Sequence, residues 1–449
     1  MKISCTVILV GALLLSGQVV AENGAEMYKS TISGDSSADA FTVVLLPDTQ
    51  YYSKDHADTY RAQTKLIAWS KECNEPIREM YNIKPPKMVI HLGDITHDNT
   101  DEEWDRADSA HAVLDEAHIP YTVIPGNHDG PVRFNRYFGP RRFEGQKWCK
   151  DWYRGHFPCT DKYILSPHDC CKNDNNYAYF EQGGLEFMVV NLEYAPRTKV
   201  LCWADAVIRR HPTRRVIIVT HGYLTHDADF FKDGEWSAET TVWLELARRH
   251  SSVFLVLCGH KNDSEYVRQE GATREGGVKN TVDAILTDYQ WEPDKDHPNG
   301  GWMRTLRFVP CMNKIYVRTF SVLDGVDWFY DPNYPADPAH LCHRYPLDYN
   351  MTTPIPYEYY AYGVTWDPNL DPNLEFAGTM RVEQGKTFEI LPGKTLIFRD
   401  GARMVVDGTV IAYGTDNDPI WFVSGQQRPR AKISSKLTIT GGGGTIRIR

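Results

Sequence analysis

Short all-apolar runs, separated by amphipathic stretches, constrain the fold of this chain more than any other sequence feature. An apolar run without alternating polar residues predicts a strand that is buried on both faces, and such runs occur at residues 41–46, 88–92, 121–124, 187–190, 216–219 and 253–257. Helical periodicity is found between them, at residues 59–81, 101–117 and 237–250. Thr100 and Glu103 offer a capping box at the start of the second helix. This alternation predicts an α/β layered domain.

The pattern changes after residue 286. Two antiparallel-looking segments, at residues 303–309 and 314–322, are expected to close the first domain near residue 325. The following segment is rich in tyrosine and proline and is expected to wrap over the surface with turns. The predicted first domain therefore covers residues 41–325, and a connecting segment covers residues 326–374.

Residues 375–449 predict a separate all-β unit, because short strands alternate there with Pro-Gly and Asp-Gly turns. The run Leu-Pro-Gly-Lys-Thr-Leu-Ile-Phe at 391–398 and the run Asp-Gly-Thr-Val-Ile-Ala-Tyr-Gly-Thr at 407–415 resemble the opening coils of right-handed parallel β-helix domains. Such a solenoid needs about three or more stacked repeats for stability, whereas only one or two coils fit in this segment. The unit is therefore expected either to dock on the first domain or to be truncated.

The N-terminal segment predicts export. Residues 1–21 combine the cationic Lys2, an apolar stretch and a small-residue exit at Val19-Val20-Ala21, as a secretory signal peptide does, and a polar linker follows at residues 22–40. The mature protein is therefore expected in the periplasm, outside the cell or at the cell surface. No later apolar run approaches the roughly 20 residues that a membrane-spanning helix needs, so no transmembrane segment is predicted.

Composition and charge exclude several classes of protein. With 42% hydrophobic and 24% charged residues, the chain has the composition of a folded globular protein rather than a disordered one. The net charge of −10 gives no general attraction to nucleic acid, which is therefore not expected as a structural partner. The sequence does not determine the oligomeric state.

The cysteines predict disulfide bonds. Of the 10 cysteines, Cys5 lies in the leader, and the odd number that is left predicts at least one unpaired thiol, which we assign to Cys258 in a buried apolar run. Five others are expected to staple a surface insert at about residues 140–205: Cys149, Cys159, Cys170, Cys171 and Cys202. A zinc site is the competing hypothesis, but an oxidising compartment favours disulfides. Their connectivity is not determined by the sequence.

Polar motifs directly follow five of the apolar runs. They are Asp48-Thr49-Gln50, Gly93-Asp94-Ile95-Thr96-His97, Gly126-Asn127-His128-Asp129, Thr220-His221-Gly222 and Gly259-His260-Lys261-Asn262. A single Asp, Asn or His after a strand is commonly a turn or cap residue. Together, however, the motifs supply carboxylates, amide oxygens and imidazoles that a layered sheet can bring to one edge. The set therefore predicts a metal site.

This ordered set resembles the calcineurin-like metallophosphoesterase family, and its first motif resembles an Asp-Thr-Gln subgroup of that family. The resemblance implies a four-layer α/β/β/α sandwich with two divalent metal ions. It implies that the first metal is held by Asp48, Gln50, Asp94 and Asn262, and the second by Asp94, Asn127, His221 and His260, with Asp94 bridging. It also implies that His128 protonates the leaving group and that Asp129 orients His128.

Three positions depart from the usual family pattern. Gln50 and Asn262 stand where the family usually has histidines, and His97 stands where an aspartate is common. Manganese, iron or zinc is expected in the pair, but amide oxygens are harder ligands than imidazole, which biases the first position toward manganese, magnesium or calcium. The first metal is therefore expected to bind more weakly than the second. His97 is expected to support a ligand or simply to pack.

The implied activity is hydrolysis of phosphate mono- or diesters by a metal-bound hydroxide, because two cations can clamp both reacting oxygens and lower the pKa of a bound water. The alternative is a catalytically weak or inactive relative that binds a surface glycan or peptide. The presence of His128 favours the enzyme, since a pure binding protein has no need of an acid beside the metals. Trp148 and Trp152 could line a substrate cleft or form the core of the insert. The physiological substrate is not determined.

Overall fold

The computed structural model describes residues 39–72, 85–157, 172–273, 279–290, 300–322, 344–354, 356–361, 363–364, 373–399, 401–424, 429–440 and 444–446. The predicted signal peptide and nearly all of the predicted linker lie outside these residues. The same holds for Cys73, Cys159, Cys170, Cys171 and Cys342. Within the described part of the chain, no helix is long and apolar enough to cross a membrane.

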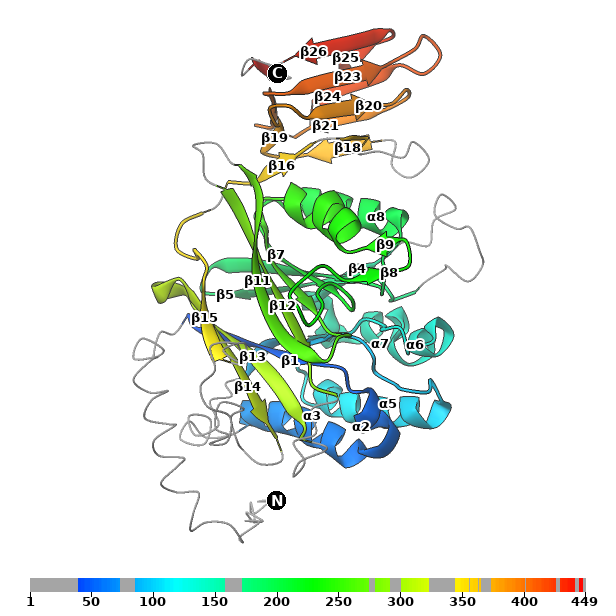
Figure 1. Cartoon of the computed structure of the whole chain (residues 1–449), viewed down its shortest axis with the longest axis vertical. Coiled ribbons are helices and arrows are strands. Elements are labelled where there is room, and N and C mark those ends of the chain that lie inside the picture. The colour runs from blue at the N-terminus through cyan, green and yellow to red at the C-terminus, as the bar shows by residue number, and fades with distance from the viewer. Residues whose placement is uncertain are drawn as a thin grey trace.

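The first of two mixed sheets is formed by three strands from the N-terminal third of the chain together with three later strands (Figure 1). Its order is β15-β14-β13-β1-β2-β3, with β1, β2 and β3 parallel to one another and the other pairs antiparallel. The strands are β1 (Phe41–Leu46), β2 (Pro86–His91), β3 (Tyr121–Thr122), β13 (Trp302–Val309), β14 (Lys314–Ser321) and β15 (Arg344–Asp348).

The second mixed sheet has the order β11-β12-β10-β7-β6-β5-β4. Strands β6, β7, β10 and β12 are parallel neighbours, and the outer pairs are antiparallel. The strands are β4 (Tyr153–His156), β5 (Asn176–Gln182), β6 (Leu185–Leu192), β7 (Arg215–Thr220), β10 (Val253–Cys258), β11 (Asp263–Thr273) and β12 (Lys279–Asp288). A separate two-stranded sheet is formed by β8 (Lys232–Asp233) and β9 (Trp236–Ser237).

Helices lie against both sheets. Those near the first sheet and its site loops are α2 (Gln50–Asp55), α3 (Ala57–Glu72), α5 (Asp101–Glu116), α6 (Pro131–Phe138), α7 (Pro140–Glu144) and the 3₁₀ turn η1 (Lys147–Asp151). The second sheet is covered by α8 (Thr198–Arg210), the π-helix η3 (Glu239–Leu246) and the 3₁₀ turn η4 (Ala247–Arg249), while η5 (Pro310–Met312) links β13 to β14. The predicted capping box at Thr100 and Glu103 is confirmed at the start of α5.

Neighbouring residues along the parallel strands pack into different hydrophobic layers. On β7, Ile217 and Val219 pack in the core shared with the first sheet, whereas Val216 and Ile218 pack in the core shared with α8. Both sets are fully buried. Continuous apolar runs are therefore required here, because a polar residue on either face would lose its water without a partner. The predicted strands are confirmed, although β3 keeps only two of its four predicted residues.

Several small sheets with parallel pairs form the C-terminal region (Figure 1). Their orders are β16-β19-β22-β27, β17-β20-β23-β26 and β18-β21-β24-β25, with the last pair in each antiparallel. The strands are β16 (Glu358–Tyr360), β17 (Gly363–Val364), β18 (Asn373–Phe376), β19 (Thr379–Val382), β20 (Thr387–Ile390), β21 (Thr395–Phe398), β22 (Arg403–Val406), β23 (Thr409–Tyr413), β24 (Ile420–Ser424), β25 (Pro429–Ile433), β26 (Lys436–Thr440) and β27 (Gly444–Ile446). Residues from these strands share one hydrophobic core with α8.

Two predicted boundaries need correction. Strand β15 joins the first sheet, so this sheet extends beyond residue 325, and strands β16 and β17 of the small sheets precede residue 375. The strand β15 was not predicted because it contains Pro346, and proline usually argues against a strand. β15 lies at the edge of its sheet, where a missing N–H is tolerated. The insert predicted at residues 140–205 is also too long, since β5, β6 and α8 belong to the second sheet and its helical cover.

The segment at 237–250 is helical as predicted, but its first part is a π-helix. The hydroxyl groups of Thr240 and Thr241 donate to the Ser237 carbonyl oxygen at 3.3 and 2.6 Å. Hydroxyl groups that bond to nearby carbonyls compete with the regular helical hydrogen bonds at the start of this segment.

Two cysteines in the described part of the chain are buried thiols outside any disulfide. Burial raises the pKa of both Cys149 and Cys258 to about 12. The prediction for Cys258 is confirmed. The prediction that Cys149 staples the insert is wrong, because this side chain packs as a small hydrophobe in the main core.

Candidate functional site

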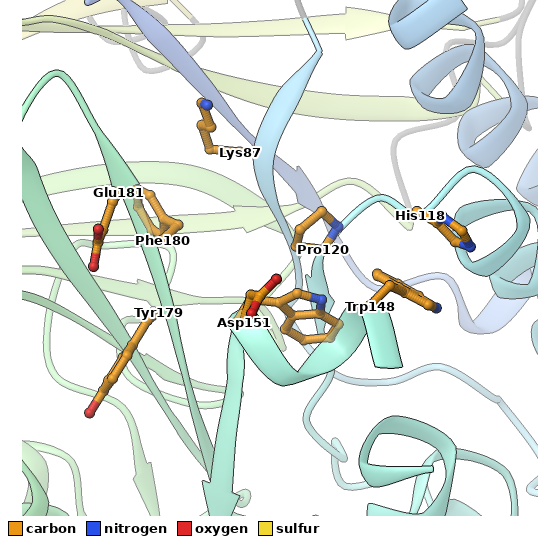
Figure 2. Close-up of a pocket in the computed structure, with 9 residues that line it drawn as sticks. Lys87, His118, Pro120, Trp148, Asp151, Tyr179, Phe180 and Glu181 are labelled. Atoms are coloured by element: carbon orange, nitrogen blue, oxygen red, sulfur yellow. The ribbon is translucent and has the colours of Figure 1, made fainter. Parts of the chain in front are cut away.

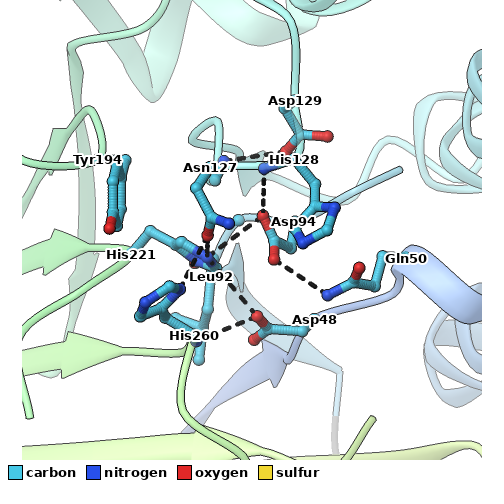
Figure 3. Close-up of polar contacts among 12 residues, drawn as sticks. Asp48, Gln50, Leu92, Asp94, Asn127, His128, Asp129, Tyr194, His221 and His260 are labelled. Carbon is cyan, nitrogen blue, oxygen red and sulfur yellow. Dashed lines mark hydrogen bonds and ion pairs between the residues drawn. The ribbon is translucent and has the colours of Figure 1, made fainter. Parts of the chain in front are cut away.

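The predicted site residues follow the carboxyl ends of parallel strands in both sheets. Asp48 follows β1, Asp94 follows β2, Asn127 follows β3, His221 follows β7 and His260 follows β10. Parallel neighbours end at one edge of a sheet, so these residues, far apart in the sequence, converge in space (Figure 3).

His221 lies at the centre of this group. Its Nε2 atom is 3.2 Å from Asp94 Oδ1, 3.8 Å from Asp48 Oδ1 and 3.1 Å from Asn127 Oδ1. Its Nδ1 atom donates to the Leu92 carbonyl oxygen at 2.8 Å. This bond fixes the tautomer and leaves Nε2 facing the carboxylates, which is the arrangement that a metal-binding histidine requires.

His260 completes the group from the opposite side. Its Nδ1 atom is 2.8 Å from Asn127 Oδ1, and its backbone N–H donates to Asp48 Oδ1 at 3.0 Å. The possible ligand atoms of Asp94, His221 and His260 all lie within 4.8 Å of one another. Asp94 and His260 have left-handed backbones, with φ of 48° and 77°, and such non-glycine strain is concentrated at functional sites.

The electrostatics of the group show that it favours positive charge. Burial alone would lower the pKa of His221, but Asp94 and Asp48 raise it to about 10. Burial raises the pKa of Asp48 well above its usual value. Burial, followed by the charge of His221, lowers the pKa of His260 to about 3. The buried carboxylates thus attract a cation, while His260 favours its neutral, ligating form.

The residues present fit a divalent cation. Asp48 Oδ2 is buried and has no hydrogen-bond partner among the described residues, so an acceptor is left unsatisfied at the centre of the group. Carboxylate, amide oxygen and imidazole donors converge there, which is a donor set suited to manganese, iron or zinc. A bound cation would satisfy the orphaned oxygen and the excess negative charge together.

Gln50 is the first residue of α2 and lies next to Asp94. Its Nε2 atom donates to Asp94 Oδ2 at 3.0 Å, and its Oε1 atom accepts from His97 Nδ1 at 2.7 Å. The Gln50 oxygen therefore faces His97, and ligation through this oxygen requires the amide to turn over. His97 is thus a support for Gln50, which was one of the two roles expected for it.

His128 stands beside Asp94 but is not held by Asp129 as expected. Its backbone N–H donates to Asp94 Oδ1 at 3.0 Å, its Nδ1 atom donates to the His97 carbonyl oxygen at 2.8 Å, and its ring stacks on that of His97. The Asp129 carboxylate instead accepts from the backbone N–H groups of Ile95, Thr96 and Gly126, each at 2.9 Å. The carbonyl group of His97, rather than Asp129, therefore orients the His128 ring. Asp129 instead links the loop after β2 to the loop after β3.

Aromatic residues that the sequence interpretation missed form one wall of the site. The Tyr194 and Phe231 rings lie 5.2 and 4.5 Å from that of His260, between ring centres. The Tyr194 hydroxyl group donates to Asp233 Oδ2 at 3.0 Å. Tyr194 follows the end of β6 at the same sheet edge, so its position after a strand was a usable signal. Asn262 lies on the loop of His260, between β10 and β11, and its ligand role stays a prediction.

A cavity of about 390 Å³ lies at another place in the fold (Figure 2). It is lined by Lys87, His118, Pro120, Trp148, Asp151, Trp152, Tyr179, Phe180 and Glu181. Lys87 lies near the start of β2, whereas the site follows the end of that strand. Trp148 and Trp152 therefore line a cavity that is separate from the metal-binding group, and the suggestion that they line its cleft is not supported.

Replacement of Gly259 by alanine is expected to weaken metal binding. An added Cβ atom would lie 2.1 Å from Asp48 Oδ2, so the buried carboxylate would have to move. We expect Mn²⁺ affinity, measured by isothermal titration calorimetry, to fall by about 10-fold or more. Gly184→Ala in the turn between β5 and β6 is the control: its φ of 76° strains an alanine, but the added Cβ atom meets no atom within 4 Å, so no metal ligand is displaced. Equal Mn²⁺ affinity in the two variants would contradict the inferred position of Asp48.

Comparison with known proteins gives a family for this arrangement. Residues 41–262 match the family described as calcineurin-like phosphoesterase. The uncharacterized protein YvnB of Bacillus subtilis is 28% identical over 291 residues, which is 63% of this chain and 20% of that protein. The probable glycerophosphodiester phosphodiesterase GpdQ of Arcobacter nitrofigilis is 41% identical over 146 residues, or 32% of this chain and 45% of that protein. The chain therefore spans less than half the length of each of these relatives.

Among solved structures, a dimetal phosphatase from Danio rerio is 17% identical with a TM-score of 0.39, over 63% of this chain and 96% of that one. The family match covers all five strand-end motifs, from Asp48 to Asn262. With the buried group of Asp94, His221 and His260 in place, residues 41–262 belong to the calcineurin-like phosphoesterase family.

Proposed function

We propose that the chain is a metal-dependent phosphoesterase that hydrolyses phosphate mono- or diesters. The observation that carries the proposal is the convergence of Asp94, His221 and His260, whose ligand atoms lie within 4.8 Å of one another in a domain of the phosphoesterase family. These residues come from three separate strand ends in two sheets. Turn formation at these strand ends does not by itself require imidazole and carboxylate groups to converge at one point.

Two cation positions are proposed. The second position would be held by Asp94, Asn127, His221 and His260, and the first by Asp48, Gln50, Asp94 and Asn262. Two divalent cations would supply an activated water as nucleophile and would neutralise charge on the phosphate. With two divalent cations on these two carboxylates the centre would be positive overall, so it would attract a phosphate ester even though the chain has a net charge of −10.

His128 is proposed as the general acid. Because its Nδ1 atom donates to the His97 carbonyl oxygen, Nε2 is the nitrogen that can exchange a proton with the leaving group. The stacked ring of His97, with ring centres 5.0 Å apart, limits rotation of His128. Asp129 would act indirectly, by holding the loop of Gly126 against that of Ile95.

The finer predictions are retained as proposals. Phosphodiesters are the first substrates to test, since one relative is named as a probable glycerophosphodiester phosphodiesterase. Residues 1–21 are proposed to direct export, and the C-terminal sheets are proposed to form a short β-helix-like unit. Support for that unit comes from the order of its strands, because each parallel layer adds one strand to each small sheet in turn.

Purified protein is expected to contain two equivalents of metal by elemental analysis. With added Mn²⁺ it should hydrolyse aryl phosphate monoesters or diesters, and a chelator should abolish this activity. Metal without turnover of any ester would favour the alternative, a binding protein. Turnover that persists after complete removal of metal would contradict the proposal.

A further inference from the structure

The loop after β12 reaches the same sheet edge as the metal-binding group. Strand β12 is parallel to β10, with Leu286 opposite Cys258, the last residue of β10. Asp288, two residues after Leu286, therefore lies level with the loop that follows β10 and carries His260. In the antiparallel pair with β11, Asp288 is opposite Asp263, the residue after Asn262. The topology therefore places Asp288 beside the loop that carries His260 and Asn262.

Side-chain contacts link this loop to the predicted first metal position. Gln50 Nε2, which donates to Asp94 Oδ2 at 3.0 Å, also donates to Gln290 Oε1. The Gln290 backbone N–H in turn donates to Asp288 Oδ1 at 3.0 Å. A continuous hydrogen-bonded path thus runs from Asp94 through Gln50 and Gln290 to Asp288.

Asp288 brings a third buried carboxylate to this region. Asp48, Asp94 and Asp288 are 3%, 1% and 0% exposed. Asp288 is tied to Asp94 through Gln290 and Gln50, and its strand partner Asp263 directly follows Asn262. Like charges that are buried together are unfavourable unless a cation joins them. Asp48 Oδ2, buried and without a hydrogen-bond partner among the described residues, is an acceptor that a cation can satisfy.

We propose that Asp288 is a further carboxylate ligand of the first metal position. The inference rests on the proposed function and deepens it. Gln50 and Asn262, like the histidines that the family usually has at their positions, are neutral, whereas Asp288 adds a negative charge to the first metal position. Together with Asp48, Gln50, Asp94 and Asn262 it makes an all-oxygen donor set, which suits Mn²⁺, Mg²⁺ or Ca²⁺ better than Zn²⁺. The contact between Gln50 Nε2 and Gln290 Oε1 holds the Gln50 amide with its oxygen toward His97, so this contact must break when the amide turns over to bind the cation.

Mn²⁺ binding to the full chain tests the assignment directly. By isothermal titration calorimetry the wild-type protein is expected to bind two equivalents. Asp288→Asn should keep one of them and weaken the other by about 10- to 100-fold. Asp283→Asn is the matched control, because Asp283 is also buried on β12 but pairs with Arg268 at 2.8 Å. This control should bind both equivalents as the wild type does.

Thermal unfolding without metal separates a ligand from a structural residue. Asp288→Asn removes repulsion among buried carboxylates, so its metal-free Tm is expected to rise by about 2 °C or more, while its gain in Tm on Mn²⁺ addition falls. Asp283→Asn loses an ion pair and should lower the metal-free Tm without changing the gain. A lower metal-free Tm for Asp288→Asn, or unchanged affinity for both equivalents, would overturn the inference.

Failure of the inference and failure of the proposed function give different results. If the wild type binds two Mn²⁺ and hydrolyses esters while Asp288→Asn binds both ions equally well, Asp288 is not a ligand and the proposed function stands. Equal weakening of both ions in Asp288→Asn would also overturn the assignment to the first position. If the wild type binds no Mn²⁺ and hydrolyses no ester, the proposed function fails and the inference fails with it.

Discussion

Asp94→Asn is expected to reduce metal-dependent ester hydrolysis by at least about 1,000-fold, because a metal centre contributes several kcal/mol to transition-state stabilisation and about 1.36 kcal/mol corresponds to a tenfold rate change. Asp94 contacts His221 Nε2 at 3.2 Å, Gln50 Nε2 at 3.0 Å and the His128 backbone N–H at 3.0 Å, so it joins both proposed metal positions. An asparagine keeps the shape of this side chain but removes the negative charge. The measurements are kcat/KM with an aryl phosphate and metal content by elemental analysis.

His128→Ala is the matched comparison for this experiment. The proposed acid is not among the proposed ligands, so this variant should keep its two equivalents of metal while its rate falls by about 10²- to 10⁴-fold. Asp94→Asn should lose both metal and rate. Turnover that survives Asp94→Asn at the wild-type level would contradict the proposed mechanism, and loss of metal from His128→Ala would place His128 among the ligands.

Asp205→Ala is expected to lower the free energy of unfolding by about 3–5 kcal/mol, the cost of leaving a buried charge without its partner. Asp205 accepts from Arg209 Nε at 2.8 Å and lies 3.1 Å from His250 Nε2, and all three side chains are buried. His250 Nδ1 is 2.9 Å from the Tyr357 hydroxyl oxygen, and Arg209 donates to the Glu375 carbonyl oxygen. The cluster therefore joins α8 to the C-terminal sheets.

Urea unfolding monitored by circular dichroism measures this effect. Glu102→Ala is the control, because Glu102 pairs with Arg106 on the surface and such pairs contribute about 0–1 kcal/mol. A loss of less than about 1 kcal/mol for Asp205→Ala would show that Arg209 finds other partners.

The difference in free energy of unfolding between the wild type and Asp205→Ala should depend on pH with a defined sign. Burial would raise the pKa of Asp205, but Arg209 and His250 together lower it below its usual value. A carboxyl group with a lowered pKa in the folded state stabilises the fold above its unfolded pKa of about 3.9 and loses this contribution as the pH falls further. The difference between wild type and Asp205→Ala should therefore be constant between pH 5 and 8 and shrink below about pH 4. A difference that shrinks already between pH 7 and 5 would contradict this origin.

Much of the fold followed from local sequence patterns. The apolar runs around Val43, Val89 and Val256 are strands because each is too continuous for a one-sided sheet and too short for a buried helix. The capping box at Thr100 worked as a signal because all its atoms lie within one turn. The strand β15 and the hairpin β11–β12 were missed, since their stability comes from cross-strand partners that are distant in sequence.

Within the site, chain order and residue type identified Asp48, Asp94, Asn127, His221 and His260, since polar residues at the ends of parallel strands must share one edge. The partners of Asp129, the orientation of the Gln50 amide and the approach of Asp288 were decided by the tertiary structure alone. Hydrogen-bond direction and the crowding of buried charge depend on distances between loops, and a linear sequence does not encode those distances locally. The sequence by itself determined which chemical groups are available, whereas only the packing of the two sheets decided which of them meet.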